Sequence, residues 1–155
     1  MKSDSMNFRP PASIDPNWKI GIVHALFYEK EVQAMVDTAK EELIKSGIKE
    51  KNIPIYPVFG SSEVPLIGSK LAQAEEVDAI IGLGIIVQGE TKHADHLSRE
   101  VARGIMDVQI KYGIPFAYAV LHVTDIAQAK VRPEKGREGA LAVLHSLAQL
   151  KRLRS

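Results

Sequence analysis

A glycine and two histidines stand close together just after an apolar segment, in the sequence QGETKHADH at residues 88–96. Gly89 at such a turn would let the backbone approach a ligand closely, and the free N–H groups that open a following helix favour an anion such as phosphate. His93 would lie in the first turn of that helix, where an imidazole that titrates near neutral pH can transfer protons beside a phosphate ester. The alternative is that Thr91 only caps the helix and that His93 is an exposed helical residue.

The same segment is a poor candidate for a metal site. His93 and His96 lie three residues apart, so they supply two ligands from one helical face, and the nearby sequence offers no third. We therefore expect no bound metal. The chain contains no cysteine, which excludes disulfides, thiolate metal sites and a cysteine nucleophile.

The charges of the chain are nearly balanced, with 20 basic and 19 acidic side chains. Binding to nucleic acid or to an anionic membrane draws on an excess of Lys and Arg, so neither partner is expected. The balance is uneven along the chain, because residues 130–155 hold seven basic and two acidic side chains. Lys130, Arg132, Lys135 and Arg137 form a basic cluster that could clamp a phosphate group, or that could be a solvated turn beside helix ends.

Two apolar segments, residues 79–87 and 113–123, are far shorter than the roughly 20 residues that cross a bilayer. Neither is expected to span a membrane. Residues 1–17 contain three prolines and no apolar run, unlike a secretory signal peptide. The sequence therefore predicts a cytoplasmic protein, with an N-terminal arm at residues 1–17 and a single domain at residues 18–155.

Hydrophobic periodicity alternates between short strands and amphipathic helices along the chain. The expected strands are residues 19–26, 53–59, 79–87 and 116–123, and the expected helices are residues 29–45, 63–74, 91–112, 125–131 and 138–153. This alternation predicts an α/β fold, a three-layer α/β/α sandwich around a four-stranded parallel sheet. Pro54 and Pro57 place the second strand at an edge of the sheet, and the apolar run at 79–87 places the third strand in its centre.

In an open parallel sheet, ligands collect at the carboxyl ends of the strands, where loops lead into helix N-termini. Those loops begin at Phe27, Gly60, Gln88 and Thr124. The segment that holds His93 therefore lies where this fold class places its ligands.

Several longer segments carry a resemblance to a known family. They are IGIVHALF (20–27), VFGSSEVPLIGSKLA (58–72), DAIIGLGIIVQGETKH (78–93), SREVARGIMDV (98–108) and GIPFAYAVLHVTDIAQA (113–129), followed by Arg132. The motifs G-[S/A]-x-E-[I/V]-P, G-x-x-x-x-G-E-T-x-H and G-[I/V]-P occur in this order, and together they are far more specific than any one of them. In these features the chain resembles the 6,7-dimethyl-8-ribityllumazine synthase family, whose parallel sheet is flavodoxin-like.

The resemblance implies an enzyme of riboflavin biosynthesis. Such an enzyme condenses 5-amino-6-(D-ribitylamino)uracil with 3,4-dihydroxy-2-butanone 4-phosphate and releases phosphate and water, without a cofactor or a metal. The resemblance also implies a homo-oligomer, either a pentamer or a shell of sixty subunits, with riboflavin synthase as a candidate further partner.

The resemblance further implies a role for each residue of the site. His93 would be the general acid and base, and Phe27 would stack on the pyrimidine ring. Ser61, Ser62 and Glu63 would bind the ribityl chain and the surroundings of the ring, and Ile85, Ile86 and Val87 would line the pyrimidine site through their backbones. Glu90, Thr91 and Arg132 would bind the phosphate with support from Lys135, and Tyr118 stands where the family takes an aromatic ring from the neighbouring subunit.

The chain departs from the family pattern in three places. Tyr28 stands where the family usually has a small polar residue, Ser62 replaces a common aromatic, and the turn at residues 132–139 is shortened. Two alternatives to the lumazine synthase reaction therefore stay open. One is the related archaeal-type riboflavin synthase reaction, and the other is a noncatalytic homologue that binds a flavin or lumazine or only forms a shell.

Overall fold

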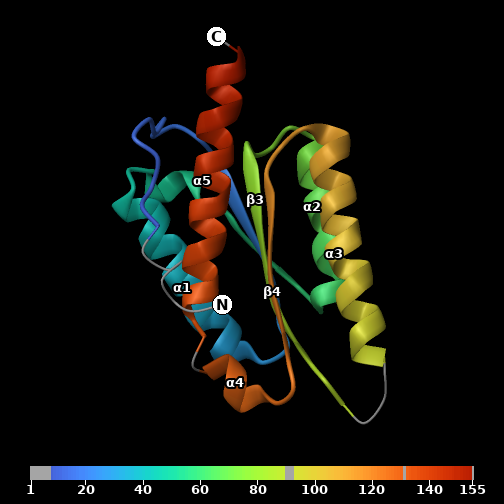
Figure 1. Ribbon diagram of the computed structural model, residues 1–155. Coiled ribbons are helices and arrows are strands. Elements are labelled where there is room, and N and C mark those ends of the chain that lie inside the picture. Colours follow the sequence, from blue (N-terminus) through green and yellow to red (C-terminus); the bar gives the residue numbers. More distant parts are fainter. Residues whose placement is uncertain (1–7, 90–92, 131, 155) are drawn as a thin grey trace.

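The computed structural model describes residues 8–89, 93–130 and 132–154, in which strands and helices alternate along the chain (Figure 1). The strands are β1 (Ile20–Ala25), β2 (Ile55–Val58), β3 (Ala79–Val87) and β4 (Phe116–Val123). The helices are α1 (Glu29–Lys45), α2 (Val64–Gln73), α3 (His93–Tyr112), α4 (Ile126–Lys130) and α5 (Glu134–Arg154), with short 3₁₀ turns η2 (Glu50–Asn52) and η3 (Ser61–Glu63). The predicted α/β class is confirmed.

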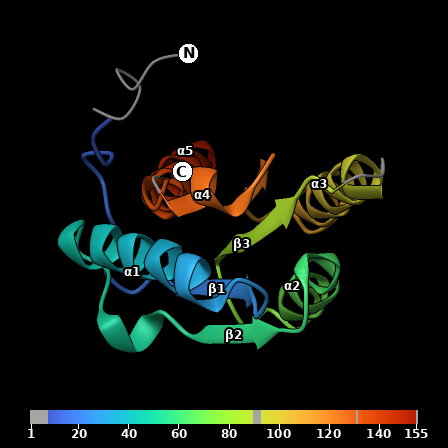
Figure 2. The ribbon, with the colours of Figure 1, turned by 90° about the horizontal axis from the view of Figure 1, so that it is seen from below.

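The four strands form one parallel sheet in the order β2-β1-β3-β4. Helices α1 and α5 cover one face of the sheet, and α2 and α3 cover the other (Figure 2). Side chains of β3 alternate between the two layers, since Ile81 and Leu83 pack with the α1 and α5 cluster and Ile80 packs with the α2 and α3 cluster. The third strand is therefore central and buried on both faces, as its apolar run predicts.

Strand β2 lies at an edge of the sheet, which confirms the prediction from its prolines. Among the described strands it pairs with β1 alone. The backbone nitrogen of Ile22 lies 2.9 Å from the carbonyl oxygen of Pro54, and that of Leu26 lies 2.9 Å from the carbonyl oxygen of Val58. The strand covers Ile55–Val58 and is shorter than expected at both ends. Its carboxyl end leads directly to Gly60 and η3.

Helix α5 begins at Glu134, four residues before the expected start at Glu138, so that prediction is wrong. The glycines in this segment suggest a turn in the sequence, but Gly136 and Gly139 are buried inside the helix. A Cβ atom on Gly136 would overlap the carbonyl oxygen of Met35 and lie 2.6 Å from the Oγ1 of Thr38, both on α1. These glycines permit close helix packing rather than a change of chain direction.

In the fold, Arg137 of the basic cluster predicted near the start of α5 is directed away to a partner on α1. The Nε of Arg137 donates to the Oε1 of Glu42 on α1 at 2.9 Å, and the Glu42 side chain is only 4% exposed. The guanidinium also donates from Nη2 to the carbonyl oxygen of Phe8 at 3.2 Å. Arg137 therefore joins α5 to α1 and to the N-terminal arm. It also gives Glu42 the charged partner that a deeply buried carboxylate needs.

Within residues 8–89, 93–130 and 132–154, no helix combines the necessary length with the necessary hydrophobicity.

Candidate functional site

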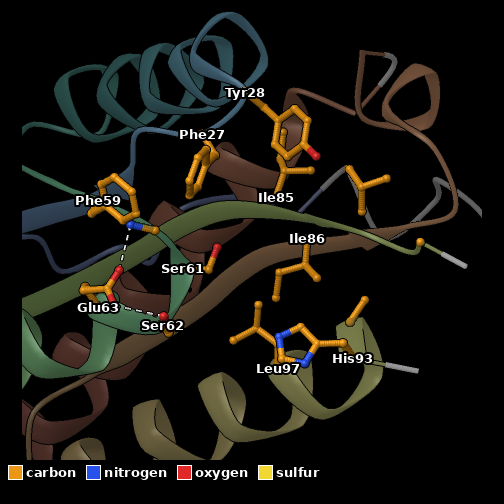
Figure 3. A pocket seen from close by; sticks show the side chains of 14 residues that line it. Phe27, Tyr28, Phe59, Ser61, Ser62, Glu63, Ile85, Ile86, His93 and Leu97 are labelled. Atoms are coloured by element: carbon orange, nitrogen blue, oxygen red, sulfur yellow. Dashed lines mark hydrogen bonds between the residues drawn. The ribbon is translucent and has the colours of Figure 1, made fainter. Parts of the chain in front are cut away.

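A cavity of about 480 Å³ opens at the carboxyl ends of β1, β2 and β3, beside the first turns of α3 (Figure 3). We call it the strand-end pocket. Its lining comes from the loops after the strands, from the last residues of β3 and from α3: Phe27, Tyr28, Phe59, Gly60, Ser61, Ser62, Glu63, Ile85, Ile86, Val87, Gly89, His93, Ala94 and Leu97. This is the edge of the sheet at which the parallel topology predicts a ligand.

The strand-end pocket brings together most of the residues that the sequence singles out. Those that line it are Phe27, Ser61, Ser62, Glu63, Ile85, Ile86, Val87 and His93. Glu90 and Thr91 lie outside the described residues. Tyr118, Arg132 and Lys135 are described but do not line this pocket.

The carboxylate of Glu63 is held in place by local hydrogen bonds. The backbone N–H of Gly60 donates to its Oε1 at 2.8 Å, and the hydroxyl of Ser62 donates to its Oε2 at 3.0 Å (Figure 3). Glu63 then leads into α2, where Pro65 is acceptable because the first helical turn needs no backbone donor there. The loop thus presents a fixed acceptor to the pocket, as a polar ligand would require.

The position of Ser61 against the sheet requires a glycine in β3. Its side chain is 7% exposed, and a Cβ atom on Gly84 of β3 would lie only 2.5 Å from its Oγ. The absence of a side chain at Gly84 therefore lets the η3 turn approach the sheet closely. This approach places Ser61, and with it the η3 turn, against β3 at Gly84.

His93 is the first residue of α3 and is exposed. Its ring projects into the strand-end pocket from the α3 side, while Phe27 and Tyr28 approach from the opposite side, and Ile85 and Ile86 lie between them (Figure 3). The predicted position in the first helical turn is confirmed. An imidazole here can reach a ligand that also touches Phe27.

Three aromatic side chains form the wall opposite His93. Phe27 is 53% exposed and Phe59 is 70% exposed, and their rings meet edge to face with centroids 5.0 Å apart and an interplanar angle of 69°. Tyr28 has φ 60° and ψ 50°, a left-handed conformation that a bulky residue rarely adopts. Strain of this kind is typical of ligand sites, where the surrounding structure maintains it.

Sequence reasoning missed Phe59 and Leu97 as lining residues. Leu97 could have been found, because it lies four residues after His93 and therefore on the same face of α3. Phe59 carries no such periodic signal. Only its position beside Gly60, at the start of a loop that follows a strand, indicates that it reaches the pocket.

The three predicted residues outside the strand-end pocket have other surroundings. Tyr118 is half-buried on β4, and its hydroxyl lies 3.0 Å from the Oγ of Ser98 on α3. Arg132 is exposed between α4 and α5. The Nζ of Lys135 lies 3.8 Å from the Oε1 of Glu138 one turn along α5.

His122 lies near the same edge of the sheet as the strand-end pocket. His122 lies with its Nε2 2.8 Å from the Oε1 of Gln88 and 3.6 Å from the Oδ1 of Asp95. In the part of the chain that the structure describes, no three His, Asp or Glu side chains are arranged to hold a metal ion.

Comparison with known proteins connects this pocket to one family. The family model described as 6,7-dimethyl-8-ribityllumazine synthase matches residues 17–151. A protein of that name from Polaromonas sp. (strain JS666) is 38% identical over 124 residues, which cover 79% of this chain and 80% of the relative. Another from Paracidovorax citrulli (strain AAC00-1) is 41% identical over 122 residues, which cover 78% of this chain and 79% of the relative.

The match spans every strand of the sheet and every loop that contributes to the strand-end pocket. It also extends over nearly the whole of α5. The chain therefore belongs to the 6,7-dimethyl-8-ribityllumazine synthase family.

Proposed function

We propose that this chain condenses 5-amino-6-(D-ribitylamino)uracil with 3,4-dihydroxy-2-butanone 4-phosphate in the strand-end pocket. Its family makes it a transferase of riboflavin biosynthesis. The observation that carries the assignment of the site is the grouping of Phe27, Glu63 and His93 around one cavity at the carboxyl edge of the sheet.

The proposed roles follow from the chemistry of the side chains. The exposed ring of Phe27 offers a flat apolar surface for the pyrimidine, and Ile85, Ile86 and Val87 line the same space. The hydroxyls of Ser61 and Ser62 and the carboxylate of Glu63 can hydrogen-bond to the hydroxyls of the ribityl chain. The two halves of the pocket thus bind a planar ring and a polyol.

The reaction needs several proton transfers and no oxidation. The 5-amino group of the pyrimidine attacks the ketone, and water is released as an imine forms. Phosphate leaves after loss of a proton from the adjacent carbon. The second amine then closes the new ring and another water is lost. His93 is the group that moves these protons in our proposal, because its imidazole enters the pocket opposite Phe27.

The phosphate end of the substrate is assigned to Glu90, Thr91 and Arg132, with Lys135 as support. Free backbone N–H groups at a helix N-terminus and a guanidinium both stabilise a departing phosphate dianion. Arg132 is exposed at the junction of α4 and α5, which leaves its guanidinium accessible to a phosphate.

Purified protein supplied with both substrates tests this function. We expect formation of 6,7-dimethyl-8-ribityllumazine and an equal amount of phosphate. Product formation from lumazine as the only substrate would instead indicate the riboflavin synthase reaction. Binding of lumazine without turnover of either mixture would indicate a noncatalytic binder and contradict the proposal.

We also propose that the active form is a homo-oligomer, at least a pentamer, in which a neighbouring subunit completes the site. Tyr118 does not line the strand-end pocket of its own chain. Large apolar side chains on α2 and α3 are exposed in the single chain, namely Leu66, Met106 and Ile110, and a contact with another subunit would cover them. Light scattering should give at least five times the 17.1 kDa of one chain, whereas a monomeric mass would contradict the proposal.

A further inference from the structure

The pair formed by Phe27 and Phe59 is an exposed aromatic contact in the strand-end pocket. Neither ring belongs to the two hydrophobic clusters that hold the helices against the sheet. Burial of core surface therefore does not explain why two large apolar rings stand together here. An exposed apolar pair inside a cavity is typical of a surface that binds a ligand.

The backbone fixes the relative position of the two rings. Both residues follow paired strands, since Ala25 of β1 is in register with Val58 of β2. The N–H of Leu26 then lies 2.9 Å from the carbonyl oxygen of Val58 and 3.3 Å from that of Phe59. Phe27 and Phe59 are thus carried by the last rung of a hydrogen-bonded ladder and not by a long loop.

The ring of Phe27 is confined on two sides. A Cβ atom on Gly60 would lie 3.4 Å from its Cε2 and 3.6 Å from its Cδ2, so the ring passes close to the Gly60 backbone. The ring of Phe59 closes a second side in the edge-to-face arrangement that aromatic pairs prefer. Without Phe59, the Phe27 ring would lose its contact on this second side and would gain rotamer freedom.

Residue 62, in the same loop, supplies no aromatic ring to the pocket. Ser62 carries no ring, and its hydroxyl donates to Glu63. No ring can therefore approach the pocket from residue 62. Phe59 approaches from the other end of the same loop.

We infer that Phe59 is a positioning residue for the pyrimidine substrate, which acts by holding the ring of Phe27 in the orientation that stacks on that substrate. The inference rests on the proposed function. It assigns the specificity for the planar ring to an edge-to-face pair, in which Phe27 touches the substrate and Phe59 restricts Phe27.

The test compares Phe59→Ala with Phe59→Tyr and with Phe8→Ala, a matched control because Phe8 is 64% exposed and lies outside the strand-end pocket. Loss of an aromatic pair should raise KM for the pyrimidine by about three- to tenfold. KM for the butanone phosphate and kcat should stay within about twofold. Phe59→Tyr should restore the wild-type KM, and Phe8→Ala should keep it.

Calorimetry with 6,7-dimethyl-8-ribityllumazine gives a second measurement that does not depend on turnover, and its Kd should rise by a similar factor in Phe59→Ala. Unchanged KM and Kd, an equal rise in both KM values, or failure of Phe59→Tyr to rescue would each overturn the inference. If the alanine variant misfolds or changes the oligomeric mass, Phe59→Leu replaces it in the same KM and Kd comparisons, because leucine keeps apolar bulk without a ring.

The two proposals can fail separately. A wild-type protein that forms lumazine with a Phe59→Ala variant of unchanged KM refutes the positioning role alone. A wild-type protein that binds lumazine without turnover refutes the enzymatic proposal, and the Kd comparison still tests Phe59.

Discussion

Replacing His93 with alanine is expected to lower kcat by about a hundredfold or more, with a much smaller effect on KM for the pyrimidine. General acid–base catalysis by one positioned side chain contributes about 10² to 10⁴ in rate. The imidazole enters the strand-end pocket opposite Phe27, and it is the only side chain of that type among the described lining residues. The measurement is steady-state formation of lumazine with each substrate varied in turn.

The matched control for this experiment is His96→Ala. His96 lies on the same helix, is exposed like His93 and does not line the strand-end pocket. Its replacement should leave kcat within about twofold, because surface substitutions of this kind rarely perturb a site. A His93→Ala variant that keeps more than about one third of the wild-type kcat would show that another group moves the protons.

Replacing Gly136 with alanine is expected to destabilise the fold by about 3 kcal/mol or more. Two effects oppose each other at this position. Alanine is favoured over glycine inside a helix by about 1 kcal/mol. The added Cβ atom, however, would overlap the carbonyl oxygen of Met35, and a backbone atom cannot turn aside as a side chain can. The steric term therefore exceeds the helix propensity, and α5 must separate from α1.

Urea unfolding monitored by circular dichroism measures this effect. Gly89→Ala serves as the control, because among the described residues beyond its chain neighbours a Cβ atom there would meet no atom within 4 Å. Its free energy of unfolding should differ from that of the wild type by less than about 0.5 kcal/mol. A Gly136→Ala variant as stable as the wild type would mean that α1 and α5 can move apart without cost.

The sequence was sufficient to predict the order of the strands and helices and the edge of the sheet at which the pocket lies. Continuous apolar residues at 79–87 identify a central strand because a parallel strand is covered on both faces, and Pro57 identifies an edge because it lacks a donor. His93 could be placed in the first turn of a helix by its distance from Gly89. These conclusions depend only on local pattern and on the topology of parallel sheets.

Other features depend on contacts between distant residues, which a single sequence does not display. The start of α5 was mistaken because Gly136 resembles a turn residue until Met35 is seen to lie against it. Phe59 was missed because its importance comes from the ring of Phe27, which lies in a different loop. Arg137 suggested a phosphate ligand, whereas the fold directs it to the buried carboxylate of Glu42.

The position of Pro57 in β2 affects whether a strand of another molecule can pair with this edge of the sheet. The carbonyl groups of Pro54 and Val58 accept hydrogen bonds from Ile22 and Leu26, so alternate residues of this segment face β1 and Pro57 faces the open side of the strand. That side therefore lacks an N–H donor near the middle of a strand of four residues. A strand from another molecule could not complete a regular ladder there, which makes this edge a poor template for edge-to-edge aggregation.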